Sequence, residues 1–578
     1  MKSRSQKSGR SQRNAPNGSR KTWWLFLAAL ACALVIGFFL YTPALSGPFL
    51  FDDLGLPFAS ATLRDRPLAD WVSGVRPVLM FSYWVNQTFF GHHPVDFHAV
   101  NVLIHVLNAA LVFLVLRRLL ALGDWMEQRL TQAAAAGALV FLIHPLQTES
   151  VSYIAGRSES LATFFMLLAY VAFLYRPKES ISWTQCILVL ALFGIAVGTK
   201  ENAISLALIL FLTDVFWPKP FSTSGLRQNW RLYALLIPGA IIAAGGVLWM
   251  LAAAPSAGFS LSGMAWPQYG LTEARAIFVY IRLAIFPVAL SIDHDYAVSH
   301  TIFEHGAIFW LLLLTGLLAA CFQLRRKYPL ACFGFLFFLA ALAPTSSIVP
   351  IADPLVERRM YLPLVGLILI GCEIIRRIRL SPPIAWSAGA VAVTLLSGWC
   401  YARNQQYAHP ETLFADSAAD STRNWRPYVH LAHTLYAERR CEEEIPYLER
   451  ADRLFPKNFD IQMEWGGALE CLGQPREAAR RLEFAAQIKP DSQAWELLGL
   501  LYGAMHKMGE SGVALRTATR LQPESPSAHR SLAIWYEAVA AYTAAEEEYS
   551  RSLALDSRDR LAGLGLFRVR QLRAKQRQ

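Results

Sequence analysis

The run Trp23–Tyr41, WWLFLAALACALVIGFFLY, decides the class of this 578-residue chain. It carries no charged residue and is long enough to cross a hydrocarbon core of about 30 Å. Similar apolar runs recur as far as residue 402, and Lys and Arg cluster beside them. Hydrophobic residues make up 54% of the sequence and charged residues 17%, whereas soluble domains have about 25% charged residues. The sequence therefore predicts an integral membrane protein built of helices.

The apolar runs predict about eleven membrane-spanning helices. After the first run, the spans are expected at residues 99–120, 133–152, 159–176, 181–198, 200–217, 231–252, 305–324, 328–345, 359–377 and 384–402. Residues 273–290 are apolar but carry three charged residues, so we expect an interfacial or re-entrant helix there, on the outer side. If they spanned, the later basic clusters would all fall outside the cytoplasm. With the basic N-terminal tail in the cytoplasm, the positive-inside rule places the C-terminal half outside the cytoplasmic (inner) membrane.

The net charge of +11 does not indicate nucleic-acid binding. Seven of the cations lie within the first 21 residues without an acidic partner, and others flank the apolar runs. This is the distribution of a protein that contacts membrane lipids. The eight cysteines show no metal-binding spacing, and the gaps between His93, His98 and His105 match no common zinc motif. We therefore expect no metal and no nucleic-acid partner.

The chain after residue 403 is charged and repetitive. Pro456, Pro490 and Pro523 lie 34 and 33 residues apart, which is the period of the tetratricopeptide repeat. Such a stack is either a helical spacer or a concave surface that binds a protein or peptide. The predicted organisation is a basic tail at 1–21, a membrane domain at 22–402, a linker at 403–424, repeats at 425–568 and a basic tail at 569–578. Cys441 and Cys471 fall at neighbouring helix ends and could form a disulfide in an oxidising compartment.

Polar residues gather in the outer loops of the predicted topology. They are Asp52, Asp53, Arg76, His98, His144, Glu149, Arg157, Glu159, Lys200, Glu201, Asp293, Asp353, Glu357, Arg358 and Arg359. Charged residues beside a membrane are costly, so they invite a functional hypothesis. Cations could hold a lipid phosphate, and a carboxylate could take the proton of an attacking hydroxyl. A loop turn, a helix cap or a local ion pair would equally account for each residue taken alone.

The order of these motifs resembles a known family. The motifs are Phe51-Asp52-Asp53, Arg76-Pro77-Val78, His93-Pro94-Val95-Asp96-Phe97-His98, His144-Pro145-Leu146-Gln147-Thr148-Glu149, Gly156-Arg157-Ser158-Glu159, Lys200-Glu201 and Glu357-Arg358-Arg359-Met360-Tyr361-Leu362-Pro363. The series is similar to that of the transmembrane and tetratricopeptide-repeat O-mannosyltransferases, and the repeats after the membrane domain agree. The short repeat array and the Gln147 position favour a bacterial relative.

The resemblance implies an all-α glycosyltransferase of the GT-C type. Such enzymes move a sugar, here mannose or another hexose, from polyprenyl phosphate to a protein hydroxyl, with inversion and without a cofactor. The expected base is Asp52 or Asp53. By the same likeness, the donor phosphate would contact Arg358 or Arg359, with Lys200 and Arg157 as second choices. The residues expected to orient the acceptor or these cations are Glu149, Glu201, His98, His144 and Glu357.

Two other functions remain open at this stage. A non-enzymatic scaffold would use the repeats to dock partners, but an anchor needs one span and not about eleven. A ligase or polymerase of lipid-linked glycans is the second alternative, and the Asp pair so soon after the first span argues against it. For the sugar transferase, the acceptor protein is expected to meet the repeats.

Overall fold

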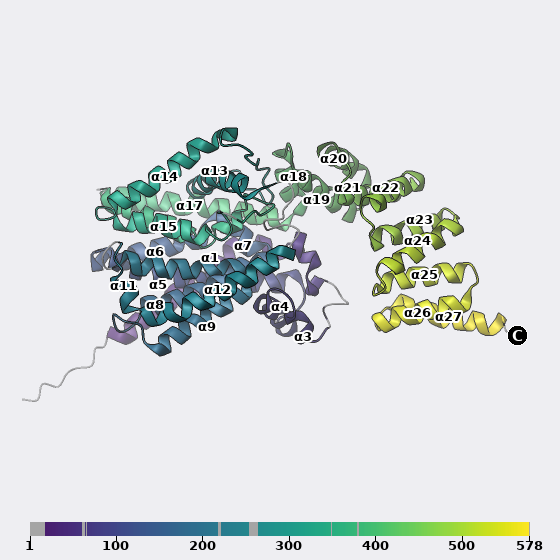
Figure 1. Cartoon of the computed structure of the whole chain (residues 1–578), viewed down its shortest axis with the longest axis horizontal. Helices are drawn as coiled ribbons and strands as arrows, with labels where there is room; N and C mark the ends of the chain where they lie inside the picture. Colours follow the sequence, from purple (N-terminus) through teal and green to yellow (C-terminus); the bar gives the residue numbers. More distant parts are fainter. Residues whose placement is uncertain are drawn as a thin grey trace, which may run out of the picture.

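The computed structural model describes residues 18–59, 64, 66–217, 221–253, 264–347, 349–378 and 381–576. These residues form helices and connecting loops, and no β-strand occurs among them. Figure 1 shows a bundle of long helices and, beside it, a row of helix pairs that leads to the C-terminus. The predicted all-helical fold is therefore confirmed.

The bundle contains the helices of the membrane half. Its helices are α1 (Gly18–Tyr41), α5 (Pro94–Leu122), α6 (Glu127–Ile143), α7 (Thr148–Ser152), α8 (Arg157–Leu174), α9 (Trp183–Thr199), α10 (Ser205–Phe216), α12 (Trp230–Ala253), α13 (Trp266–Ile285), α14 (Ala307–Leu324), α15 (Pro329–Leu342), α16 (Leu364–Arg377) and α17 (Pro382–Ala408). Short helices and 3-10 turns join them: η1 (Pro43–Ser46), η2 (Phe51–Gly55), η3 (Pro57–Ala59), α3 (Leu68–Val72), α4 (Pro77–Phe89), η4 (Pro145–Gln147), η5 (Ile154–Gly156), η6 (Glu201–Ile204), α11 (Ser224–Gln228), η7 (Glu304–Gly306) and η8 (Glu357–Met360).

Five described helices are long and apolar enough to cross a membrane, or six if a bent pair at Arg129–Ile143 and Pro145–Ser152 counts as one span. Three shorter apolar helices accompany them, at Trp183–Thr199, Trp230–Gly246 and Pro329–Leu342. Each predicted span overlaps a helix, but the span at 133–152 is broken after Ile143 into α6, η4 and α7, and the span at 200–217 consists of η6 and α10. The number of about eleven stays a prediction. The helix α13, predicted to be interfacial, is not among the candidate spans.

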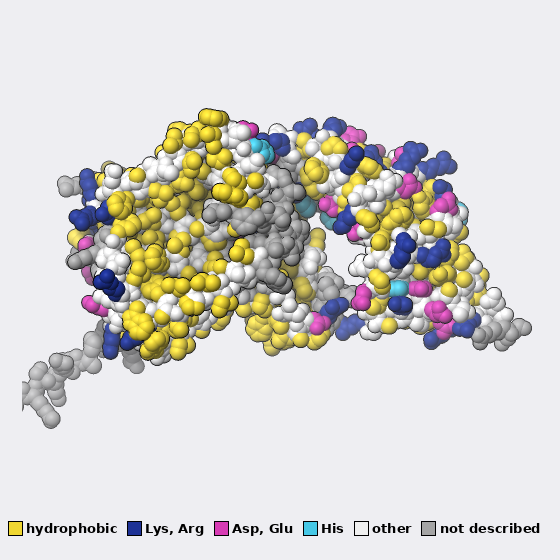
Figure 2. All heavy atoms as spheres, viewed as in Figure 1, with side chains coloured by type: hydrophobic (Ala, Val, Ile, Leu, Met, Phe, Trp, Pro, Cys, Tyr) yellow, Lys and Arg dark blue, Asp and Glu magenta, His cyan; other side chains and the backbone are white. Residues whose placement is uncertain are grey.

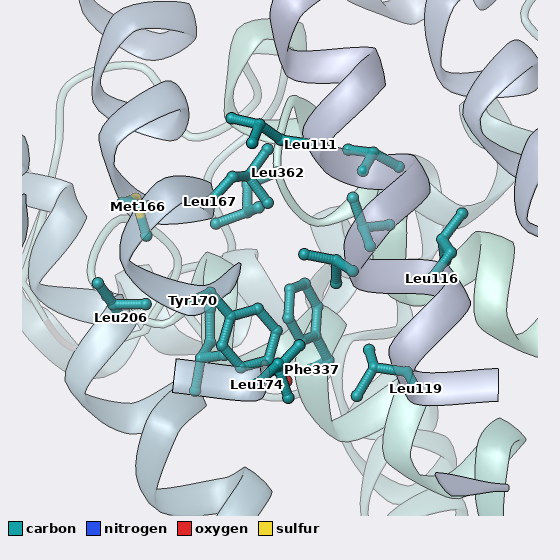
Figure 3. Packing of buried hydrophobic residues seen from close by; sticks show 14 of the residues in the cluster. Leu111, Leu116, Leu119, Met166, Leu167, Tyr170, Leu174, Leu206, Phe337 and Leu362 are labelled. Atoms are coloured by element: carbon teal, nitrogen blue, oxygen red, sulfur yellow. The ribbon is translucent and has the colours of Figure 1, made fainter. Parts of the chain in front are cut away.

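The bundle core is built around α5, whose valines and leucines face α6 and α8. Figure 3 shows Leu111, Leu116 and Leu119 of α5 in one buried cluster with Tyr170 of α8 and Phe337 of α15. The helices α15 and α16 approach closely through glycines. A Cβ on Gly366 would lie 2.4 Å from the carbonyl oxygen of Gly334, so neither position has room for a side chain. Small residues serve the same purpose in other membrane bundles.

The outer surface of the bundle is apolar. Figure 2 shows hydrophobic side chains covering its visible face, while Lys and Arg gather at the end farthest from the repeats. Exposed apolar faces of this extent suit a lipid environment. The predicted topology places the repeats on the opposite side of the membrane from the basic clusters, and this orientation stays a prediction.

The C-terminal half is a stack of antiparallel helix pairs. The pairs are α19 (Arg426–Ala437) with α20 (Cys441–Leu454), α21 (Phe459–Cys471) with α22 (Pro475–Ile488), α23 (Ser492–Ala504) with α24 (Met508–Leu521) and α25 (Pro526–Ala538) with α26 (Tyr542–Leu555), followed by α27 (Arg560–Gln576). Each predicted repeat proline stands two residues after a second helix ends. The disulfide between Cys441 and Cys471 is confirmed, with a Cα–Cα separation of 6.2 Å.

Two boundaries differ from the prediction. The predicted linker at 403–424 contains the last residues of α17, which ends at Ala408, and the helix α18 (Pro410–Ala419), which packs against α19. The predicted basic tail after residue 568 continues α27 to Gln576. Both segments are polar, but their apolar residues recur at helical spacing. These residues are covered by a neighbouring helix, α19 for α18 and α26 for α27.

The turn inside each repeat needs a left-handed residue. Arg439, Gly473, His506 and Ala540 occupy this place, with φ between 59° and 68°. We expect Ala540→Gly to raise the free energy of unfolding by about 1 kcal/mol, because glycine carries no Cβ penalty at positive φ. The reciprocal change, Gly473→Ala, is expected to lower it by a similar amount, although the space around Gly473 is open. Denaturant unfolding followed by circular dichroism measures both, and shifts of the same sign would contradict the expectation.

Candidate active site

A large cleft separates the bundle from the first repeats. Its volume is about 1060 Å³. The floor comes from the loop at 48–54, from Tyr153 and from residues 353–358, all at the bundle end that faces the repeats. The other wall comes from α18, α19 and α21. The cleft therefore joins the predicted outer-loop motifs to the repeat domain.

The two aspartates of the first outer loop have different surroundings: Asp52 faces the cleft and Asp53 is buried. Asp52 is exposed and lines the cleft, and its backbone N–H donates to the Tyr153 hydroxyl at 3.0 Å. Asp53 is only 1% exposed. Its two carboxylate oxygens accept from the backbone N–H groups of Leu50 at 2.9 Å and Ala155 at 2.7 Å. Burial raises the pKa of Asp53 to about 7. Asp53 thus ties the loop to η5, and Asp52 is the carboxylate that meets the cleft.

Arg358 reaches the same cleft from η8. Glu149 of α7, which is fully buried, accepts from the Arg358 backbone N–H at 2.8 Å and from its guanidinium at 2.5 Å. This arrangement fixes the arginine by two bonds and leaves part of its guanidinium facing the cleft. Charge-assisted pairs of this kind hold a cation in one orientation. The structure brings together Asp52, Arg358 and Glu149, three of the residues predicted from the sequence.

A second charged cluster lies beside this one. Lys200 pairs with Glu159, and Arg76 forms two bonds to Glu201, at 2.6 and 3.0 Å. Lys200 lies within electrostatic range of both Arg76 and Arg358. Lys200, Arg76 and Arg358, each paired with a carboxylate, therefore lie close enough to influence one another electrostatically at this end of the bundle. Arg76 has no role predicted from the sequence, although its Arg-Pro motif belongs to the ordered series.

Other predicted site residues are held inside the protein. The Arg157 guanidinium donates to Asn101, Asn86 and the Phe97 carbonyl, at 2.6, 2.7 and 3.0 Å. Arg359 donates to the carbonyls of Pro354 and Asp353 at 3.0 and 2.6 Å, and it lies 3.6 Å from buried Glu273. Neither arginine lines the cleft within the described part of the chain. Their neighbours occupy the hydrogen-bonding positions that a phosphate would need.

The histidines and Glu357 brace loops. A ring nitrogen of His98 lies 3.3 Å from the Gly47 carbonyl, and one of His144 lies 3.0 Å from the Ala284 carbonyl. Glu357 is buried, accepts from the Ser291 N–H at 2.7 Å and bonds His294 at 2.8 Å. Across the described ranges, no group of three or more His, Cys, Asp or Glu side chains could hold a metal ion.

Curated relatives match most of this chain. Protein O-mannosyl-transferase TMTC3 of Mus musculus is 22% identical over 550 residues, which cover 83% of this chain and 57% of the relative. TMTC1 of Homo sapiens is 26% identical, with 66% and 48% covered, and Tmtc1 of Drosophila melanogaster is 33% identical, with 33% and 23% covered. The matched regions thus span 57% of the length of the mouse relative and less than half of the other two. No protein-family model matches the chain.

Two solved structures of tetratricopeptide-repeat proteins each match less than a third of the chain. The tetratricopeptide-repeat protein TTC0263 of Thermus thermophilus is 18% identical with a TM-score of 0.26, covering 31% of this chain and 95% of that one. YrrB, described as a repeat protein with an unusual peptide-binding site, is 18% identical with a TM-score of 0.24, covering 29% and 85%. Through its curated relatives, the chain is similar over most of its length to the protein O-mannosyl-transferases, as its motifs predict.

Proposed function

We propose that the chain is a membrane glycosyltransferase of the GT-C type that acts on protein hydroxyl groups. The donor is a polyprenyl phosphate that carries mannose or another hexose. The observation that carries the proposal is the exposed carboxylate of Asp52 in one cleft with the anchored guanidinium of Arg358. The names of the relatives, protein O-mannosyl-transferases, support the reaction class.

The reaction is a single displacement at the anomeric carbon. Asp52 takes the proton of the acceptor hydroxyl as its oxygen bonds to that carbon. The bond from the anomeric carbon to the phosphate oxygen breaks, and its electron pair leaves with the polyprenyl phosphate. Attack from the side opposite the leaving group inverts the configuration. Asp52 then returns its proton to solvent, so the products are the glycosylated acceptor and the polyprenyl phosphate.

Side-chain cations compensate the charge that develops on the leaving phosphate. Arg358 is the first of these, since Glu149 already fixes its orientation. Lys200 and Arg76 add positive charge nearby, and Glu159 and Glu201 hold them. Preorganised charges act strongly in a site that excludes water, because they need not reorganise during the reaction. In this proposal the protein's own cations stabilise the leaving phosphate, and no metal or cofactor takes part.

The acceptor polypeptide enters between the bundle and the repeats. Helix α19 turns one face toward the cleft, with residues spaced as on one side of a helix: Arg426, Val429, His430, His433, Thr434 and Ala437. The cleft therefore has one wall from each half of the chain. We place the cleft and the repeats outside the cytoplasmic membrane and the N-terminus inside, in line with the positions of the basic clusters.

Purified protein in lipid nanodiscs, given polyprenyl-phosphate hexoses and hydroxyl-bearing acceptor peptides, tests the proposal. We expect one hexose to be added to the peptide, with release of one polyprenyl phosphate, and an unchanged rate when a chelator is present. Mass spectrometry of the peptide and chromatography of the lipid measure both products. Transfer of whole oligosaccharides would favour the ligase alternative. Absence of transfer from every hexose donor and acceptor would contradict the proposed function.

A further inference from the structure

Phe51, the residue before Asp52, has an unusual backbone conformation. Its φ is 44°, in the left-handed region that side chains with a Cβ rarely occupy. The residues on either side are tied down: the Leu50 N–H bonds to the Asp53 carboxylate, and the Asp52 N–H bonds to Tyr153. Such a conformation persists only where the surroundings hold it, and it is often found at functional sites.

Three aromatic rings surround the Phe51 side chain. The ring of Tyr153 lies 6.1 Å away, that of Phe414 4.9 Å and that of His430 4.3 Å, all in edge-on arrangements. Phe414 and His430 also stack on each other at 5.3 Å. Two of the three rings thus come from α18 and α19, in the C-terminal half. Aromatic pairs at these distances contribute more than their buried area alone.

The histidine of this aromatic group is a neutral ring. Burial lowers the pKa of His430 to about 4, and the nearby Arg426 and His433 act in the same direction. At neutral pH the side chain therefore packs as an uncharged aromatic ring. The His430 ring therefore contributes to the site by packing against Phe51 and Phe414, and we expect another aromatic ring of similar size to substitute for it.

Polar contacts hold α18 and α19 against the bundle beside this group. The Arg426 guanidinium bonds to Asp293 and Asp353, both at 2.6 Å. The carboxylate of Asp295 accepts from the backbone N–H groups of Thr422 and Arg423 and from the Thr422 hydroxyl, at 2.8 to 3.0 Å. These contacts fix the segment between α18 and α19, so the two rings face Phe51 in one defined arrangement.

We propose that α18 and the first repeat helix, α19, form part of the active-site framework. His430 and Phe414 hold Phe51 in its left-handed conformation, and this keeps the Asp52 carboxylate in the cleft while Asp53 stays buried. His430 is then a positioning residue that acts through Phe51. The inference rests on the proposed role of Asp52, and it gives the repeats a task besides meeting the acceptor.

The full-length protein with His430→Ala and with His430→Phe tests the proposal. We expect the alanine variant to lower kcat by about ten- to hundredfold with little change in the KM of the lipid donor, because the base is misplaced and the donor site is intact. The phenylalanine variant should restore most of kcat. A loss of activity that phenylalanine does not rescue would overturn the proposal, as would full activity of the alanine variant.

A second measurement does not depend on catalysis. Hydrogen exchange should speed up in His430→Ala at the amides of Asp52 and Asp53, which donate to Tyr153 and to the Leu50 carbonyl. It should stay at the wild-type rate in His430→Phe, with the amides of α21–α26 unchanged in both variants. Equal exchange in all three proteins would overturn the positioning role. If the wild type transferred no sugar, the proposed function would fail, while the exchange pattern would still decide whether the repeats hold this loop.

Discussion

Asp52→Asn is expected to abolish sugar transfer while the protein keeps its fold. The side chain is exposed in the cleft, where the Tyr153 hydroxyl is its polar neighbour. An amide oxygen can accept from that hydroxyl as a carboxylate does, so the change removes the proposed proton acceptor without altering burial. Loss of a general base lowers the rate by about 10²- to 10⁴-fold. Turnover with a polyprenyl-phosphate hexose, measured beside the thermal unfolding temperature, separates the effect on the chemistry from any effect on stability.

The neighbouring residue supplies the matched control. Asp53→Asn replaces one of two carboxylate oxygens with an amide nitrogen, yet both oxygens accept from backbone N–H groups. One of these donors then faces another donor in a buried place, which costs about 1–3 kcal/mol. We expect a lower unfolding temperature for this variant and a smaller loss of turnover at temperatures where it stays folded. A stable Asp53→Asn variant without activity, together with an active Asp52→Asn variant, would reverse the assignment.

Arg157→Lys is expected to cause a large loss of stability. Arg157 is fully buried and its guanidinium crosses between α4 and α5, where it bonds Asn86 and Asn101 and lies 4.6 Å from the Tyr83 ring. Lysine has a single nitrogen and cannot reproduce this planar set of bonds. Two buried amide oxygens would lose their donor, at a cost of about 1–3 kcal/mol each.

The exposed Arg282 of α13 gives a comparison with the same change. Arg282→Lys is expected to leave the unfolding temperature unchanged, because its side chain is exposed. Thermal unfolding in detergent compares the two variants directly. If Arg157→Lys kept the wild-type unfolding temperature but lost affinity for the lipid donor, Arg157 would be a phosphate ligand as the family resemblance implies. If the Arg157→Lys variant were unstable, Arg157 would instead have a structural role in the packing of the bundle.

Local patterns along the chain predict the helices and the repeats well. A tetratricopeptide repeat depends on contacts between residues within one period, so its spacing of prolines and small residues is readable without a structure. Pro456 and Pro490 mark the ends of second helices in both the sequence and the structure. The segment at 403–424 was the exception. Its helix α18 is stabilised by α19, and a pattern within ten residues does not reveal that neighbour.

The sequence predicts the site residues and a role for each group of them, but it does not say which member of each adjacent pair faces the cleft. Asp52 and Asp53 are adjacent, and so are Arg358 and Arg359, yet only one of each pair meets the cleft. Neighbouring side chains in a tight turn point in different directions, and which one is buried depends on backbone donors far away in the sequence. The Ala155 N–H that holds Asp53 lies 102 residues along the chain. His430 carries no sequence signal at all, because its position in α19 looks like any half-buried helix position.

The amino-acid sequence therefore determines by itself that this chain is a helical membrane protein followed by repeats, because hydropathy and periodicity are properties of short segments. It also identifies the polar motifs that gather at one end of the bundle. Which residues of those motifs face the cleft, and which are buried, depends on how the two halves of the chain pack against each other. That packing places Phe414 and His430 beside Phe51 and leaves Asp52 facing the cleft, through contacts between residues more than three hundred positions apart.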